Sequence, residues 1–157
     1  MIGAIVIRPA TDEDSQEIAE VSSLAVADLR RVYRPTLAAI AEARRKPVQR
    51  LVAVVDGRVV GAVKYLVQEQ CLHVMGPMVL PSHRRRGVAR KLFDSLADIA
   101  RDMGLTRLSL VTITATGNVA TFQKLGFAVV SESTATGIES ATGEALREAR
   151  MERLLTV

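Results

Sequence analysis

Aromatic residues are scarce in this chain of 157 residues, which has no tryptophan, two tyrosines and three phenylalanines. Proteins that hold single-stranded nucleic acid commonly stack its bases on aromatic side chains, and this chain has few to offer. Aliphatic side chains must therefore fill the core. A nucleic-acid partner is disfavoured on composition alone.

Cysteine and histidine are equally scarce: Cys71 is the only cysteine, and the histidines are His73 and His83. A single cysteine excludes a disulfide within the chain and suits a reducing compartment, so we expect a cytoplasmic protein. These three side chains are too few to support a zinc site. We therefore expect no metal.

Long apolar runs are also missing. The longest falls far below the ~18 residues that a membrane span requires, and residues 1–8 lack the basic and apolar regions of a signal peptide. We expect no membrane partner. The net charge is +4, from 21 basic and 17 acidic residues. This modest excess is compatible with nucleic acid, with an acidic cofactor, or with no charged partner.

The apolar spacing divides the chain into strands and helices. A helical period predicts helices at about residues 12–30, 35–47, 88–103 and 118–125, the second opened by Pro35 and closed by Pro47. Valine-rich runs flank Asp56-Gly57 and predict a hairpin over residues 50–67. Further strands are predicted at residues 4–8, 71–79, 105–113 and 127–133. Residues 134–143 read as a small-residue loop, and local propensity favours a helix at 147–155.

This order of elements predicts an α+β fold with helices layered on a sheet. Three consecutive strands in the middle of the chain indicate antiparallel pairing, whereas the helix at 88–103 joins two strands by a right-handed parallel crossover. We expect a mixed, mostly antiparallel sheet in a single domain over residues 1–157.

The stretch VLPSHRRRGVARKLF, residues 79–93, has the features of an anion-binding loop. Arg84, Arg85 and Arg86 stand directly before Gly87, where a predicted amphipathic helix begins. A helix N-terminus has free N–H groups and positive potential, and glycine lets a phosphate approach the backbone. The GxxxxGK[ST] and GxGxxG patterns of nucleotide loops are absent. A solvated arginine cluster, or a basic nucleic-acid surface, remains the alternative.

This stretch resembles the acetyl-CoA loop of the GNAT superfamily of N-acetyltransferases, whose pattern is roughly V-x-P-x-x-[QR]-x-x-G-x-[GA]. All its positions are matched, by Val79, Pro81, Arg84, Gly87 and Ala89. VIRPATDEDSQEI, VAVVDGRVVGAV, FQKLGF and RMERLL resemble further family elements in the same order. The resemblance implies a twisted GNAT-like sheet of about seven strands flanked by about four helices. It also implies a closing strand, not a helix, at residues 147–155.

The resemblance implies a set of residues that bind acetyl-CoA. They are Met78, Val79 and Leu80 for the pantetheine arm, Arg84, Arg85, Arg86, Gly87, Val88 and Ala89 for the pyrophosphate, and Asn118 and Phe122 beside them. Among the arginines, Arg85 is the one that we expect to be replaceable. Gly76-Pro77 is a suitable site for a β-bulge that would separate this strand from its neighbour.

Attack of an amine on a thioester requires a base for the ammonium proton and an acid for the departing thiolate. His73 resembles the family's base position, although a half-buried histidine with a local partner is the alternative. The tyrosine that often serves as the acid is replaced by Phe122, which cannot donate a proton. Tyr33 is the substitute that the sequence offers. A Cys71 acyl-enzyme is conceivable, but a buried apolar cysteine is preferred.

The predicted function is acetyl transfer from acetyl-CoA to a primary amine, on a small molecule or a peptide, by direct attack within a ternary complex. The alternative is a non-catalytic CoA-binding or regulatory domain of the same fold, which the missing tyrosine suggests. Residues 26–46 and 134–143 are expected to shape the acceptor site. The arginines of the first segment favour an acceptor with a carboxylate, and the resemblance also admits a homodimer.

Overall fold

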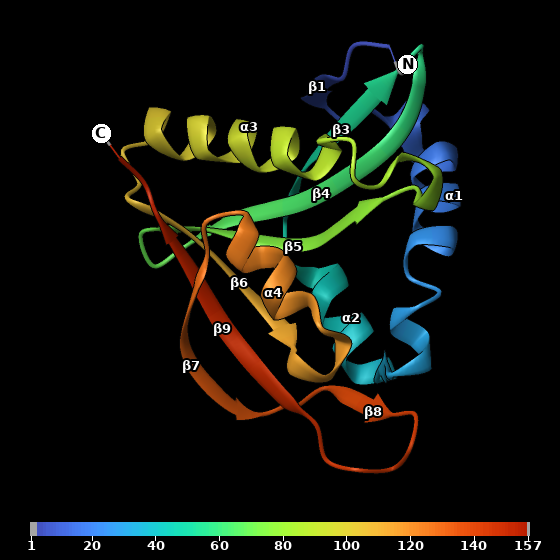
Figure 1. Cartoon of the computed structure of the whole chain (residues 1–157), viewed down its shortest axis with the longest axis vertical. Coiled ribbons are helices and arrows are strands. Elements are labelled where there is room, and N and C mark those ends of the chain that lie inside the picture. The colour runs from blue at the N-terminus through green and yellow to red at the C-terminus, as the bar shows by residue number, and fades with distance from the viewer. Residues whose placement is uncertain (1–2, 157) are drawn as a thin grey trace.

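The computed structural model describes residues 3–156, in which a mixed sheet carries helices on both faces (Figure 1). The helices are α1 (Ser15–Ala25), α2 (Leu37–Arg45), α3 (Val88–Asp102) and α4 (Asn118–Lys124). The strands are β1 (Val6–Pro9), β2 (Tyr33–Pro35), β3 (Gln49–Val55), β4 (Arg58–Gln68), β5 (Cys71–Val79), β6 (Arg107–Ile113), β7 (Ala128–Thr134), β8 (Ile138–Ser140) and β9 (Arg147–Leu154). Seven of them form a sheet in the order β1-β3-β4-β5-β6-β9-β7, and β2 pairs with β8 separately.

One parallel pair interrupts this otherwise antiparallel sheet. β5 and β6 run parallel, and the other neighbouring strands pair in antiparallel fashion. Helix α3 forms the crossover between β5 and β6, as the sequence predicts. The α+β fold class, with about seven strands in the main sheet and about four helices, is confirmed. So is the closing strand, which is β9.

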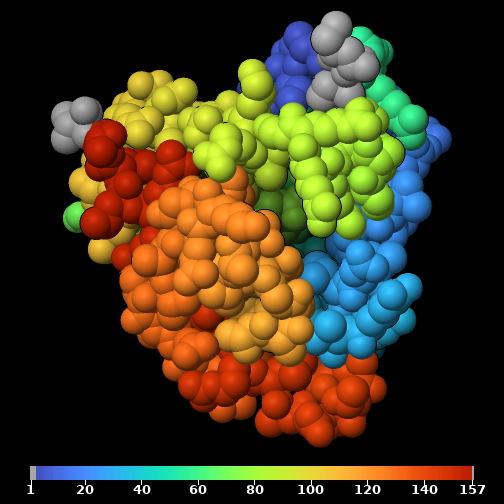
Figure 2. Space-filling model, in the orientation of Figure 1, coloured from blue at the N-terminus to red at the C-terminus, as the bar shows by residue number. Residues whose placement is uncertain are grey.

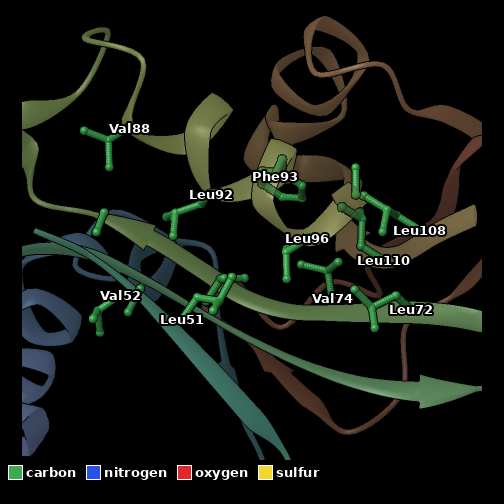
Figure 3. Close-up of a cluster of buried hydrophobic side chains, with 14 of the residues drawn as sticks. Leu51, Val52, Leu72, Val74, Val88, Leu92, Phe93, Leu96, Leu108 and Leu110 are labelled. Atoms are coloured by element: carbon green, nitrogen blue, oxygen red, sulfur yellow. The ribbon is translucent and has the colours of Figure 1, made fainter. Parts of the chain in front are cut away.

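The main layer of the core lies between α3 and the sheet. Leu92, Phe93 and Leu96 of α3 are each at most 1% exposed and point toward the strands (Figure 3). The residues that meet them are alternate positions of β5 and β6, namely Leu72, Val74, Leu108 and Leu110. Because side chains alternate along a strand, the intervening residues of β5 and β6 face the other side of the sheet.

The middle of the sheet is covered on both faces. Every residue of β4 from Val59 to Val63 is buried, which requires packing on either side. On one side, a Cβ at Gly61 would lie 3.1 Å from Val88 of α3, so glycine permits the close approach of this helix. On the other side, Glu17 of α1 accepts a hydrogen bond from the N–H of Val59 at 2.8 Å.

The start of α1 is fixed by a buried carboxylate. Asp14 is 7% exposed, and its oxygens accept hydrogen bonds from the Arg8 guanidinium at 2.8 and 2.9 Å and from the Thr11 N–H at 2.7 Å. These bonds hold the pKa of Asp14 well below its usual range, with the Arg8 hydrogen bond the largest cause. The predicted helix at 12–30 is broken, because α1 ends at Ala25 and a short 3₁₀ turn follows.

Two further sequence-based predictions are corrected. Pro35 belongs to strand β2 and does not open α2, which begins after Thr36; the Thr36 hydroxyl caps the helix by accepting from the Ala39 N–H at 3.1 Å. The segment predicted as a loop at 134–143 contains strand β8, which pairs with β2. This short ribbon connects two segments that lie about 100 positions apart in the sequence. No helix within residues 3–156 combines the length and apolarity needed to cross a bilayer.

Candidate functional site

Strand β5 carries a bulge in its second half. Gly76 and Pro77 together lie opposite a single residue of β4, Val63. Gly76 has a φ of +55°, which glycine adopts at little cost, and proline lacks the N–H that a regular ladder would use. The bulge lies at the site that the sequence suggested.

β5 separates from β6 just before the bulge. Their parallel pairing ends at His73 and Ser109, here called the apex pair, although β5 continues to Val79 and β6 to Ile113. The two strands therefore diverge as a V-shaped gap. A gap of this kind leaves backbone N–H and C=O groups unpaired at the centre of a sheet, where a ligand can use them.

Val79 presents such groups to the gap. The neighbouring Leu80 N–H donates to the Val60 carbonyl at 2.8 Å, which marks a hydrogen-bonded rung between β5 and β4. Hydrogen-bonding direction alternates along an antiparallel strand, so the N–H and C=O of Val79 point away from β4. Leu80 is 3% exposed and its N–H is already engaged. The geometry therefore favours Val79, and not Leu80, as a ligand contact.

The loop between β5 and α3 offers a row of free N–H groups. Within residues 3–156, no protein acceptor receives a hydrogen bond from the backbone N–H groups of Arg85 to Arg90. Arg85 and Gly87 have φ values of +62° and +85°, a left-handed turn geometry that can gather successive N–H groups around an anion. A Cβ at Gly87 would meet no atom within 4 Å, so the space beside this residue is open.

Two arginines fix this loop to neighbouring helices. Arg84 donates to the Ala25 carbonyl at the end of α1 at 3.2 Å and lies 3.6 Å from Asp28. Arg90 donates to the Lys124 carbonyl at the end of α4 at 3.2 Å. A helix C-terminus carries negative potential, so both contacts are favourable. They hold the loop between the two helices that border the gap.

A cavity of about 580 Å³ lies where these elements meet. Figure 2 shows it as a hollow between the yellow-green loop before α3, the orange α4 and the blue segment after α1. The implied cofactor residues that line it are Met78, Val79, Arg84, Arg85, Gly87, Val88, Ala89, Asn118 and Phe122. Leu80 and Arg86 do not line it. Arg85 faces the cavity and Arg86 does not, which is the reverse of their expected importance.

Phe122 belongs to a cluster of the three phenylalanines. Its ring centroid lies 6.1 Å from those of Phe93 and Phe127, which are 5.5 Å from each other, all in edge-to-face geometry. Phe93 and Phe127 are buried, whereas Phe122 is half-buried and lines the cavity. The ring therefore joins the core to the cavity wall, where it contributes apolar surface.

The structure also shows wall residues that the sequence did not name individually, although Leu29 and Val32 lie in the segment 26–46 that was expected to shape the acceptor site. Ala25, Leu29 and Val32 form the side of the cavity after α1, and Thr116 and Thr121 lie on the α4 side. The packing of α1 on the sheet and the hydrogen bond from Arg84 to the Ala25 carbonyl bring the first group to the loop. No local sequence motif predicts that these residues line the cavity, because their position depends on packing between segments that are distant in sequence.

His73 does not line the cavity but lies at the apex of the gap. Its Nδ1 is 2.9 Å from the Ser109 hydroxyl, and Ser109 is 1% exposed. Burial lowers the pKa of the half-buried His73, and the charges of Arg150 and Lys46 lower it further. The imidazole is therefore neutral over a wider pH range than an ordinary histidine, as a base requires. Ser109 is also the local partner that we would expect if His73 were a half-buried structural histidine.

The other catalytic candidates lie apart from the cavity wall. Tyr33, in β2, is half-buried beneath the Arg30 guanidinium, 5.7 Å from the ring centroid, and does not line the cavity. Cys71 is fully buried, and its sulfur accepts a hydrogen bond from Arg107 at 2.9 Å. Its Sγ is thus enclosed, in agreement with the preference for a structural cysteine.

The chain belongs to the acetyltransferase (GNAT) family, whose model matches residues 18–127. This range includes most of α1, the hairpin β3–β4, the bulged β5, the arginine-rich loop, α3 and α4. No curated protein sequence matches the chain.

Many solved structures share the fold. The ribosomal-protein-S18-alanine N-acetyltransferase of Escherichia coli is 16% identical, with a TM-score of 0.74 over 98% of this chain and 96% of that one. A GCN5-related N-acetyltransferase from Kribbella flavida is 25% identical, with a TM-score of 0.71 over 97% and 98%. An IAA acetyltransferase from Bacillus cereus is 20% identical, with a TM-score of 0.71 over 97% and 100%.

Proposed function

We propose that this protein is an N-acetyltransferase that transfers an acetyl group from acetyl-CoA to a primary amine, of a small molecule or a peptide, in a ternary complex. The observation that carries the proposal is the row of free N–H groups from Arg85 to Arg90 at the edge of the 580 Å³ cavity. It agrees with membership of the GNAT family.

The residues present fit acetyl-CoA. The free N–H groups and the guanidinium of Arg85 would hold the pyrophosphate, and the open space beside Gly87 leaves room for it. The backbone of Val79 and the ring of Phe122 would line the pantetheine arm. When bound there, acetyl-CoA supplies an acetyl group activated as a thioester. The N–H of Val79 points into the gap, where it would polarise a carbonyl oxygen.

His73 is the base in this proposal. In the tautomer whose Nδ1–H donates to Ser109, the lone pair is on Nε2, which takes the ammonium proton directly or through water. Tyr33 stays a weaker prediction for the acid, since it lies in the β2–β8 ribbon outside the cavity wall. Solvent protonates the thiolate in the simplest version of this mechanism.

The direct test is isothermal titration with acetyl-CoA, followed by an assay of free thiol in the presence of a panel of amines. Saturable binding and acceptor-dependent thiol release are expected. Absence of binding at high micromolar acetyl-CoA would contradict the proposal. Dephospho-CoA and desulfo-CoA serve as matched ligands: the first lacks only the 3′-phosphate and keeps the pyrophosphate, and the second lacks the thiol.

A non-catalytic CoA-binding domain is the second candidate, and the phenylalanine at position 122 favours it. The two candidates differ in turnover and not in cofactor affinity. Acetyl-CoA binding without thiol release, for every amine and peptide tested, would support the binding domain. Thiol release with any acceptor would exclude it.

A further inference from the structure

The sheet face opposite α3 carries cations around the V-shaped gap. Lys64 pairs with Met75, and Arg150 pairs with Val111. Met75 and Val111 are each two residues beyond the apex pair, in the direction in which the strands diverge. Side chains two residues apart on a strand share a face. Lys64 and Arg150 therefore lie on either side of the gap, on the face toward which the apex pair points.

Lys64 is a half-buried cation beside the bulge. A Cβ at Gly76 would lie 3.4 Å from its Cε. Within residues 3–156, no carboxylate lies within 4.0 Å of its ammonium group. Burial lowers the pKa of Lys64, and the neighbouring Arg50 adds to this effect. A partly desolvated ammonium without a counter-ion is a favourable place for an anionic ligand.

The β9 side of the gap also has more positive than negative charge. Arg150 lies 3.6 Å from Glu152, but the same carboxylate also lies 3.6 Å from Arg107 and is thus shared by two guanidinium groups. Glu148 is two residues from Arg150 on the same face and is in no ion pair among residues 3–156. Lys46 adds a further positive charge near the apex. Cations therefore outnumber carboxylates around the gap.

A simple ammonium would be repelled from a face of this sign, because like charges raise each other's energy in a partly buried site. An acceptor that brings its own carboxylate removes the repulsion and gains charge-assisted hydrogen bonds. We propose that the acceptor is a primary amine that carries a carboxylate, which Lys64 and Arg150 bind on the sheet face opposite α3 while the amine meets His73. This inference rests on the proposed function and deepens it.

The test compares two amines of nearly equal basicity, 4-aminobutanoate and butylamine, by thiol release from acetyl-CoA with the full chain. The carboxylate should raise kcat/KM by about tenfold or more. Lys64→Met should remove most of that advantage by lowering the rate with 4-aminobutanoate, and it should not lower the rate with butylamine, which loses a repulsive charge; Lys64→Arg should retain the advantage. Lys91→Met, a matched substitution on the exposed side of α3, should change neither rate. A tripeptide with an N-terminal aspartate, compared with its asparagine counterpart, tests the same carboxylate preference in a peptide acceptor.

Equal kcat/KM values for the two amines, or an equal loss for both in a folded Lys64→Met, would overturn the inference. Calorimetric titration of acetyl-CoA on the same samples separates it from the proposed function. Binding of acetyl-CoA without turnover of any carboxylate-bearing amine overturns the acceptor assignment and leaves the cofactor site standing. Absence of acetyl-CoA binding overturns both. Thermal melts verify that each variant is folded.

Discussion

The two faces of the gap between β5 and β6 are built in different ways. On the α3 face, the proposed cofactor site consists largely of backbone groups from one continuous stretch, Arg85 to Arg90, at the start of a helix. On the opposite face, the proposed acceptor site consists of side chains from β4, β5, β6 and β9, which the register of the sheet brings together. A backbone site needs a local conformation and open space, whereas a side-chain site needs several strands to be aligned correctly.

This contrast predicts that a substitution at Gly87 has the largest effect, which is on the affinity for acetyl-CoA. Gly87→Asp should weaken acetyl-CoA binding at least about 100-fold, because it puts a carboxylate in an anion site and a side chain at a φ of +85°. Gly87→Ala is the control, since it adds the backbone strain, roughly 1–2 kcal/mol, without the charge. Calorimetry measures both affinities. An unaltered affinity in Gly87→Asp would show that the loop does not hold the pyrophosphate.

The next largest effect is expected at His73, on turnover and not on cofactor affinity. His73→Gln should lower kcat about 10- to 100-fold, within the range typical of a lost general base, and leave the Kd for acetyl-CoA unchanged. Because burial and nearby cations lower the pKa of His73, the wild-type kcat/KM should fall at the acid end only below the pH at which an ordinary histidine becomes protonated. That acid limb should be missing in the variant. A limb that persists unchanged would assign the base to another group.

A smaller effect separates two adjacent arginines of the loop. Arg85→Ala should weaken acetyl-CoA binding about fivefold, because Arg85 lines the cavity and lies among the free N–H groups. Arg86→Ala should change the affinity less than about twofold, because an exposed charge outside the cavity is screened. Titrations at low and moderate salt measure both. The opposite ranking would restore the order expected from the sequence.

The smallest effect is expected at Ser109, which contacts His73 and not the cavity. Ser109→Ala should lower kcat about threefold and shift the acid limb of kcat/KM, because the imidazole loses its partner at Nδ1. Thr112→Val, on the same strand, should move neither quantity, and Ser109→Thr should restore the limb. If Ser109→Ala lowered kcat/KM equally at every pH and left the acid limb of its pH profile in place, Ser109 would have only a packing role.

The sequence predicts the elements whose signals are local. Asp56 and Gly57 both have positive φ and close the β3–β4 hairpin at the predicted place. Gly87 precedes α3 as predicted, and the bulge occurs at Gly76-Pro77. In each case the backbone conformation depends mainly on the residue type at that position.

Local signals are insufficient where long-range packing decides the conformation. Pro35 is acceptable both at the first turn of a helix and in an edge strand, and only its pairing partner Ile138 on β8 selects the strand. The 147–155 segment illustrates the same point: propensity favours a helix, but β6 and β7 on either side make it a strand. The ranking of Arg85 and Arg86 likewise depends on which side chain the loop turns toward the cavity.

By itself, then, the sequence determined the conformation of the loop before α3: three arginines, a glycine and an amphipathic helix, contiguous in sequence, predict an exposed row of N–H groups at a helix start. Only the tertiary structure decided the opposite face. The register that sets His73 beside Ser109, and the divergence that leaves Lys64 and Arg150 on either side of a gap, come from strand pairing across the whole sheet. Such pairing is selected by packing against α1 and α3, which no short stretch of sequence encodes.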